Sequence, residues 1–199
     1  MKENQENDLQ QLLTATEPYD RWKQIILMSR KQGDADTAGT LFVFFEECPQ
    51  TFWRLLALFA IDHIYEGSDL PRQMLAQAAS YLNSKDGILL RGLVGFLANR
   101  KTVGLPYLID FLQTNQHLML REDILTAAIY HAANGDQALI QEFAKQNTNF
   151  SLYCRHRVWP QNFKANYDVF PYSDYLYRSA LTMGLTKKQF KSLYFIPWE

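Results

Sequence analysis

The sequence predicts an all-α protein built from stacked helix pairs, and three observations carry this prediction. An arginine opens an apolar stretch four times, at Arg21, Arg54, Arg91 and Arg121, with intervals of 33, 37 and 30 residues. Apolar positions recur with helical spacing in nearly every segment, and almost nothing alternates with period two. Glycine- and aspartate-containing turns follow the apolar stretches where a helix should end. Recurrence at this interval is typical of two-helix repeats.

The four helices that contain these arginines, which we call the arginine helices, share an apolar face. Aligned on the arginine, two columns of small or aliphatic residues lie four and seven positions further on, so they fall on the same side of a helix. The +4 column reads Ile25, Leu58, Gly95 and Leu125, and the +7 column reads Met28, Ile61, Ala98 and Ala128. We therefore expect these columns to be buried against neighbouring helices.

A second set of helices should lie between each turn and the next arginine. The turns are Gly33-Asp34, Gly67-Ser68-Asp69, Thr102-Val103-Gly104 and Asn134-Gly135-Asp136, and the helices expected beside them span about 36–47, 70–83, 104–114 and 136–147. Pro18, Pro71 and Pro106 fall near helix starts, where the missing N–H costs little.

The C-terminal quarter differs from the stack before it. Residues 151–199 carry a net charge of +4 against −5 for residues 1–150, and 13 of the 28 aromatic residues fall in the last 50 positions. Helices are expected at about 173–183 and 186–195, on either side of Gly184. The prediction is a repeat stack over 1–147 and a cap over 148–199 within one structural domain, because the last repeat of a stack needs its apolar face covered. Alternatively, the aromatic residues form an interface for a partner.

The segment GLPYLIDFLQ, followed after a short break by LREDILTAAIYHAANGD, resembles a HEAT repeat of the armadillo-type superhelices. In that family a proline opens the first helix of a pair and an arginine opens the second, as Pro106 and Arg121 do here. The resemblance covers about residues 5–147 and is strongest over 104–135. It implies a right-handed superhelix of about four pairs, with the arginine helices lining the concave face. Such folds act through the surface they display.

Composition favours a cytoplasmic protein. The formal net charge is −1, which gives no overall field for binding DNA or an anionic membrane, so neither is expected as a partner. The N-terminus MKENQENDLQQ is too polar for a signal peptide, and runs such as LLALFAI are far shorter than a membrane span. Cys48 and Cys154 are expected to be free thiols.

Few residues suggest chemistry, and no cofactor or metal is expected. His63 with Asp62 and Glu66 could supply half of a metal site, but no second half is visible and a histidine at a helix end explains it better. Cys154 stands beside a cationic and aromatic group, for which an enzyme acting on a nucleic acid or nucleotide, with its site near 154–164, is the alternative function. The residues of this alternative site are Arg155, His156, Arg157 and Trp159.

A stripe at positions +2, +5 and +9 of the arginine helices is the leading candidate for a binding surface. Its expected centre is Phe59 with Phe96, and its border is His63, Arg100 and Tyr130. An apolar strip with a charged border is typical of a protein-binding groove. Alternatively, the two phenylalanines pack inside the stack.

The sequence therefore predicts a non-enzymatic module that binds a protein partner. A bacterial adaptor or a toxin-neutralising immunity protein would fit this description by analogy alone.

Overall fold

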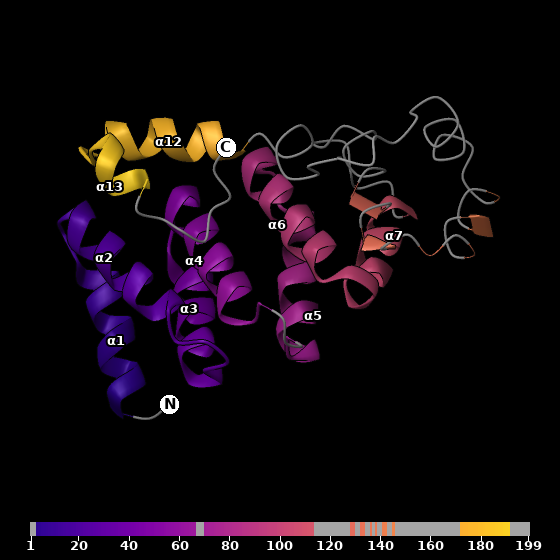
Figure 1. Cartoon of the computed structure of the whole chain (residues 1–199), viewed down its shortest axis with the longest axis horizontal. Helices are drawn as coiled ribbons and strands as arrows, with labels where there is room; N and C mark the ends of the chain where they lie inside the picture. Colours follow the sequence, from indigo (N-terminus) through magenta and orange to yellow (C-terminus); the bar gives the residue numbers. More distant parts are fainter. Residues whose placement is uncertain are drawn as a thin grey trace. The chain divides into compact units, whose positions relative to one another are not determined.

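The computed structural model describes residues 3–66, 70–113, single positions between 128 and 145, and 172–191. It is mostly helical, at 80%, and its described residues contain no strand, so the all-α class is confirmed. Met1–Met74 and Tyr172–Glu199 form one compact unit, and Leu75–Pro171 form a second. Both units are drawn in Figure 1.

The first unit begins with two helix pairs. Helix α1 spans Glu3–Thr14 and α2 spans Pro18–Ser29, while α3 spans Ala35–Glu47 and α4 spans Thr51–Ile64. α1 packs on α2 and α3, and α4 packs on α2 and α3. Pro18 stands at the first turn of α2, as the sequence predicted. Asp34 caps α3 by accepting hydrogen bonds from the backbone N–H groups of Asp36 and Thr37.

The second unit continues with helices at the expected places. α5 spans Arg72–Ser80, whose first residues belong to the preceding unit, and the short helix η1 spans Tyr81–Asn83. α6 spans Gly87–Asn99, η2 spans Lys101–Val103 and α7 spans Leu105–Gln113. α6 packs on α7 and on both short helices. Asp86 caps α6 through the N–H groups of Ile88 and Leu89.

The first two arginines close their helix pairs with the same contact. Arg21 of α2 reaches back to the end of α1, where Nε donates to the Leu12 carbonyl at 2.8 Å and Nη2 to the Leu13 and Ala15 carbonyls at 3.2 and 2.8 Å. Arg54 of α4 donates through Nε to the carbonyl of Phe45 in α3 at 2.9 Å. In both pairs an acceptor lies nine residues before the arginine. For Arg21 and Arg54 the recurrence therefore has a physical cause, because the last carbonyls of a helix have no partner within it.

The +4 and +7 columns are buried wherever the structure describes them. Ile25, Leu58, Ile61 and Ala98 are fully buried, and Met28 and Ala128 are 5% and 1% exposed. Gly95 is also buried, and Leu125 lies outside the described residues. The predicted burial is thus confirmed for all described positions of the two columns.

The C-terminal helices form a hairpin specified by local hydrogen bonds. α12 spans Tyr172–Thr182 and α13 spans Lys187–Lys191. Gly184 adopts φ +85° between them, and the N–H of Leu185 bonds the Ala180 carbonyl at 3.0 Å, which is the Schellman ending of a helix. Thr186 and Gln189 then form a reciprocal capping box, with bonds of 2.6 and 3.2 Å.

This hairpin contacts the first helix pair. The Phe190 ring lies 5.7 Å from that of Trp22 in α2 and 5.3 Å from that of Tyr177 in α12, measured between centroids. Figure 1 shows α13 (yellow) beside α2. The sequence shows that the C-terminal quarter is rich in aromatic residues, but it did not predict that this part contacts α2. The division into a stack over 1–147 and a cap over 148–199 stays a prediction.

Candidate functional site

Three residues of the predicted stripe lie at the C-terminal ends of the arginine helices. Arg30 is the C-cap of α2, His63 lies in the last turn of α4, and Arg100 is the C-cap of α6. Arg30 is exposed, and His63 and Arg100 are partly exposed. Arg30 and Arg100 are cations at this end of a helix, where a positive charge interacts favourably with the helix dipole, and this gives the two positions a structural reason. Among the described residues of the stripe, a partner could reach the +9 residues and Lys23 of the +2 column.

The apolar centre of the stripe is buried, and the expectation of an exposed apolar strip is wrong for the described positions. Phe59 is 7% exposed and Phe96 only 1%. The +2 residues Leu56 and Leu93 are fully buried. α4 and α6 carry apolar side chains around most of their circumference, and a helix of this kind is covered on all sides. Tyr130, together with Asp123 and Thr126, lies outside the described residues.

The end of α4 is closed by the turn between α2 and α3. The N–H of Gly33 donates to the Ile64 carbonyl at 2.8 Å, and Gln32 Nε2 donates to the His63 carbonyl at 3.0 Å. His63 Nδ1 also lies 3.0 Å from Glu66 Oε2. The helix ends that carry Arg30 and His63 are therefore held together in one surface of the first unit.

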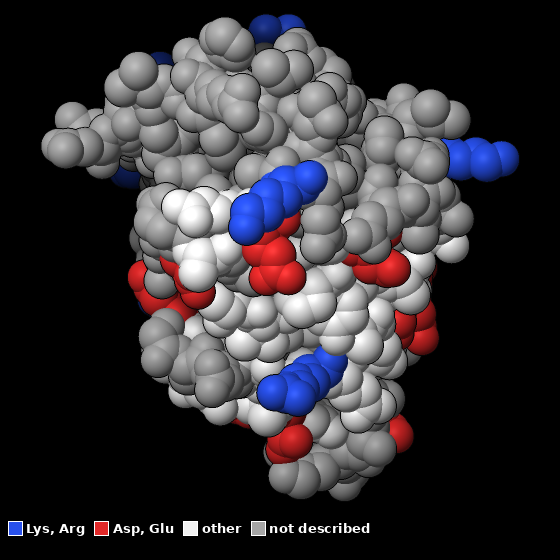
Figure 2. Space-filling view, turned by 90° about the vertical axis from the view of Figure 1, so that its right-hand side faces the viewer, with Lys and Arg blue, Asp and Glu red and all other residues white. Residues whose placement is uncertain are grey.

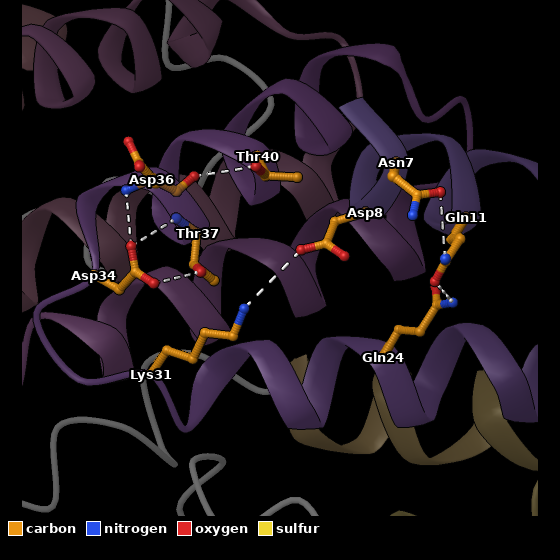
Figure 3. Close-up of polar contacts among 9 residues, drawn as sticks. All are labelled: Asn7, Asp8, Gln11, Gln24, Lys31, Asp34, Asp36, Thr37 and Thr40. Atoms are coloured by element: carbon orange, nitrogen blue, oxygen red, sulfur yellow. Dashed lines mark hydrogen bonds and ion pairs between the residues drawn. The ribbon is translucent and has the colours of Figure 1, made fainter. Parts of the chain in front are cut away.

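Polar contacts fix the same turn from the other side (Figure 3). Lys31 Nζ lies 4.0 Å from Asp8 Oδ2 of α1, and Gln24 Nε2 donates to Gln11 Oε1 at 3.1 Å. Asp34 Oδ2 accepts the Thr37 hydroxyl at 2.9 Å. The first two contacts join α1 to α2 and to the residue after its C-cap, while the Asp34–Thr37 bond is local to the start of α3.

Two titratable groups beside this surface have shifted pKa values. The hydrogen bond from the Thr37 backbone lowers the pKa of Asp34, opposed by partial burial and aided by the Thr37 hydroxyl, the Asp36 backbone and the Lys31 charge. Burial raises the pKa of Tyr65, and the negative charge of Asp34 raises it further. Near neutral pH, Asp34 is therefore a carboxylate and Tyr65 a neutral phenol.

The cap made by Asp34 should make the free energy of unfolding depend on pH in the acid range. Because the folded pKa is depressed, the contribution is present above the unfolded pKa of about 3.9 and disappears as the pH falls through the folded value. At pH 7, Asp34→Ala should lower the free energy of unfolding by about 0.5–2 kcal/mol. Asp34→Asn keeps a capping acceptor but cannot titrate, so the wild type should lose stability relative to this variant below about pH 4 in urea titrations. Parallel pH profiles of the two proteins would show that Asp34 carries no such contribution.

The end of α6 has a different arrangement. The Arg100 guanidinium lies 5.9 Å from the centroid of the buried Phe96 ring. Lys101, directly after this C-cap, adopts φ +53°, the left-handed conformation that glycine usually supplies at this position. Burial lowers the pKa of Lys101.

Figure 2 shows Lys and Arg side chains beside Asp and Glu side chains on the described part of one face, so both signs of charge are interspersed there.

The alternative site lies beyond what the structure describes. Arg155, His156, Arg157 and Trp159 are all outside the described residues, as is Cys154. An enzyme acting on a nucleic acid or nucleotide near 154–164 therefore stays a prediction. Cys48 is a buried free thiol at the C-cap of α3.

The described helices meet the requirements neither for a metal site nor for a membrane span. In the described ranges, His63 and Glu66 do not join further ligands into a group that could hold a metal ion. No helix in this part of the chain is both long enough and apolar enough to cross a membrane.

Sequence reasoning missed the aromatic surface of α2. Trp22 is 1% exposed and stacks on Phe52 with ring centroids 6.3 Å apart, and it also receives Phe190 from the C-terminal hairpin. The Thr186–Gln189 pair was a readable capping signal for α13. Nothing local indicates that α13 meets Trp22, because the two partners are separated by most of the chain.

Comparison with known proteins gave no match among family models, curated proteins or solved structures. The function of the chain is therefore inferred from the contacts of its own residues.

Proposed function

We propose that the chain is a non-enzymatic, cytoplasmic protein-binding module, whose helix pairs form a HEAT-like right-handed superhelix. Its partner would contact the C-terminal ends of the arginine helices. A bacterial adaptor or a toxin-neutralising immunity protein is the kind of protein that works by such steric capture. In this proposal residues 148–199 cap the stack.

The observation that carries the proposal is the repeated closure of the helix pairs by arginine. Arg21 and Arg54 each donate to a carbonyl nine residues earlier, so α2 and α4 are joined to the preceding helix by the same contact. Equivalent helices then present equivalent positions, and the +9 residues Arg30 and His63 stand at neighbouring helix ends tied by the Gln32 and Gly33 hydrogen bonds. A fixed scaffold with recurring surface positions is how repeat proteins build a binding face.

Basic residues at this surface favour a partner with acidic side chains. Arg30 and Lys31 are both exposed, and Lys31 Nζ lies 4.0 Å from Asp8 Oδ2. Charged residues at the rim of an interface mainly raise the association rate and select the partner. The partner surface should therefore carry the opposite charge.

The proposal predicts that charge reversal at the +9 column abolishes capture while the fold survives. We expect the double variant Arg30→Glu and Arg100→Glu to retain its helical circular dichroism, with a stability loss of about 1 kcal/mol per site from the helix dipoles. Retrieval of the partner identified with tagged wild-type protein should fall at least about tenfold, which corresponds to about 1.4 kcal/mol.

Lys85→Glu is the matched control, because Lys85 is exposed before the start of α6 and lies outside the stripe. It should retrieve the partner as the wild type does. Undiminished capture by the folded double variant would exclude this surface. Phe96→Ala is unsuitable for the test, because loss of a fully buried ring costs about 3–5 kcal/mol and would confound binding with unfolding.

A further inference from the structure

The C-terminal hairpin is held together by its own contacts. The Schellman bonds around Gly184 and the Thr186–Gln189 capping box all join residues within α12, α13 and their turn. α12 and α13 pack mainly on each other among the described elements. These bonds therefore do not depend on the contact with α1–α4.

The four N-terminal helices also have a framework of their own. α1, α2, α3 and α4 pack on one another, and Arg21 and Arg54 close the two pairs. Lys31, Gln32 and Gly33 then tie the turn after α2 to α1 and α4. None of these contacts involves the hairpin.

Phe190 makes the aromatic part of the contact between the two parts, and Leu176, Ala180 and Leu185 of the hairpin are buried as well. Phe190 is fully buried and lies on Trp22, which also stacks on the ring of Phe52. The indole Nε1 of Trp22 is buried in this arrangement and has no hydrogen-bond acceptor among the described residues. A buried N–H without an acceptor opposes burial, so the closed contact leaves unmet a hydrogen bond that another occupant could accept.

We propose that α12–α13 is a reversible clasp, and that the surface it covers on α2 is a docking site for a short helix with one aromatic anchor. The displacing helix would insert its ring on Trp22, where Phe190 lies now, and offer an oxygen to the Trp22 N–H. This step rests on the proposed function, since the helix belongs to a protein partner. Capture by the +9 surface and release of the clasp would then both use α2.

Charge indicates what kind of helix fits. α13 carries Lys187 and Lys188, both exposed, beside its anchor Phe190. Glu17, the N-cap of α2, and Asp20 in its first turn are exposed, as is Lys23 beside Trp22. The docking helix therefore combines an aromatic residue with neighbouring basic residues, as the chain's own clasp does.

Hydrogen exchange of the unaltered protein tests the clasp directly. If the clasp opens as a unit, the amides of α12 and α13 should share one protection factor, at least tenfold below those of α3 and α4. Protection of the hairpin equal to that of α3 and α4 would overturn the proposal, because the hairpin would then leave only when the whole unit unfolds.

A peptide probe tests the docking site without any partner. A fluorescent peptide of residues 172–191 should bind the full-chain variant Phe190→Asp at least tenfold more tightly than the wild type, in which the clasp occupies the site. Leu181→Asp is the matched control, because Leu181 is 43% exposed on α12 and this variant should behave as the wild type. The same peptide with Phe190→Asp should not bind.

Two results of this experiment would overturn the proposal. The first is a folded Phe190→Asp variant that does not bind the peptide. The second is loss of the α1–α4 fold in that variant, because a clasp must leave its unit intact. Neither result bears on the +9 surface, which is tested separately with the partner.

Discussion

Leu58→Ala should lower the free energy of unfolding by about 2–5 kcal/mol, the usual range for removing a leucine side chain from a core. Leu58 is fully buried in the middle of α4, and Ile61 of the +7 column is buried one turn later. α4 packs on both α2 and α3, so the cavity left by the leucine has neighbours on two sides that cannot all move into it.

The chain offers a control with the same chemical change. Leu27 of α2 is 58% exposed, so Leu27→Ala removes the same atoms from a surface position and should change stability by less than about 1 kcal/mol. Urea unfolding of the two variants, compared by midpoint and slope, measures the difference. A cost below about 0.5 kcal/mol for Leu58→Ala would mean that the +4 column does not carry the core.

The helices could be predicted because local signals fix them. The helix expected at about 36–47 is α3, Ala35–Glu47, and the one expected at about 104–114 is α7, Leu105–Gln113. Their ends are set by groups within a few residues, such as Asp34 at the start of α3. The buried columns followed from the same phase, since a helix fixes which residues share a face.

The binding stripe could not be predicted from phase alone. A period of 3.6 residues places Phe59 and Phe96 on one side of their helices, but it does not tell whether that side is covered. The sequence held a further signal, because TFWRLLALFAIDHI is apolar around nearly its whole circumference, and such helices are buried. α2 differs, since it leaves Lys23 and Leu27 exposed.

The contact of α13 with α2 could not be predicted for another reason. Trp22 and Phe190 are brought together by tertiary folding, and no periodicity or spacing relates residues so far apart in the chain. The hairpin itself was accessible, because Gly184 and the Thr186–Gln189 pair are local signals. Local capping signals thus predict where the helices begin and end, while the surface that α13 covers depends on how the helices pack in the tertiary structure.

Arg21 belongs to the recurring arginine positions and also packs against two aromatic rings. Its guanidinium bonds three carbonyls at the end of α1 and lies 5.3 Å from the centroid of Trp53 and 5.9 Å from that of Phe44. Hydrogen bonds to a charged group contribute about 1.5–3 kcal/mol each, and part of this returns when water reaches the released carbonyls. We therefore expect Arg21→Ala to cost about 2–4 kcal/mol of unfolding free energy.

Two further variants separate the geometry of Arg21 from its charge. Arg21→Lys keeps the charge but replaces a planar fork with a single ammonium, which cannot reach all three carbonyls, so it should recover less than half of the lost stability. Lys23→Ala removes a cation from the exposed side of the same helix, where it lies over Tyr19, and should cost less than about 1 kcal/mol. Full recovery by Arg21→Lys in thermal and urea unfolding would show that charge alone matters at this position. The recurrence of arginine would then need a cause other than closure of the helix pair.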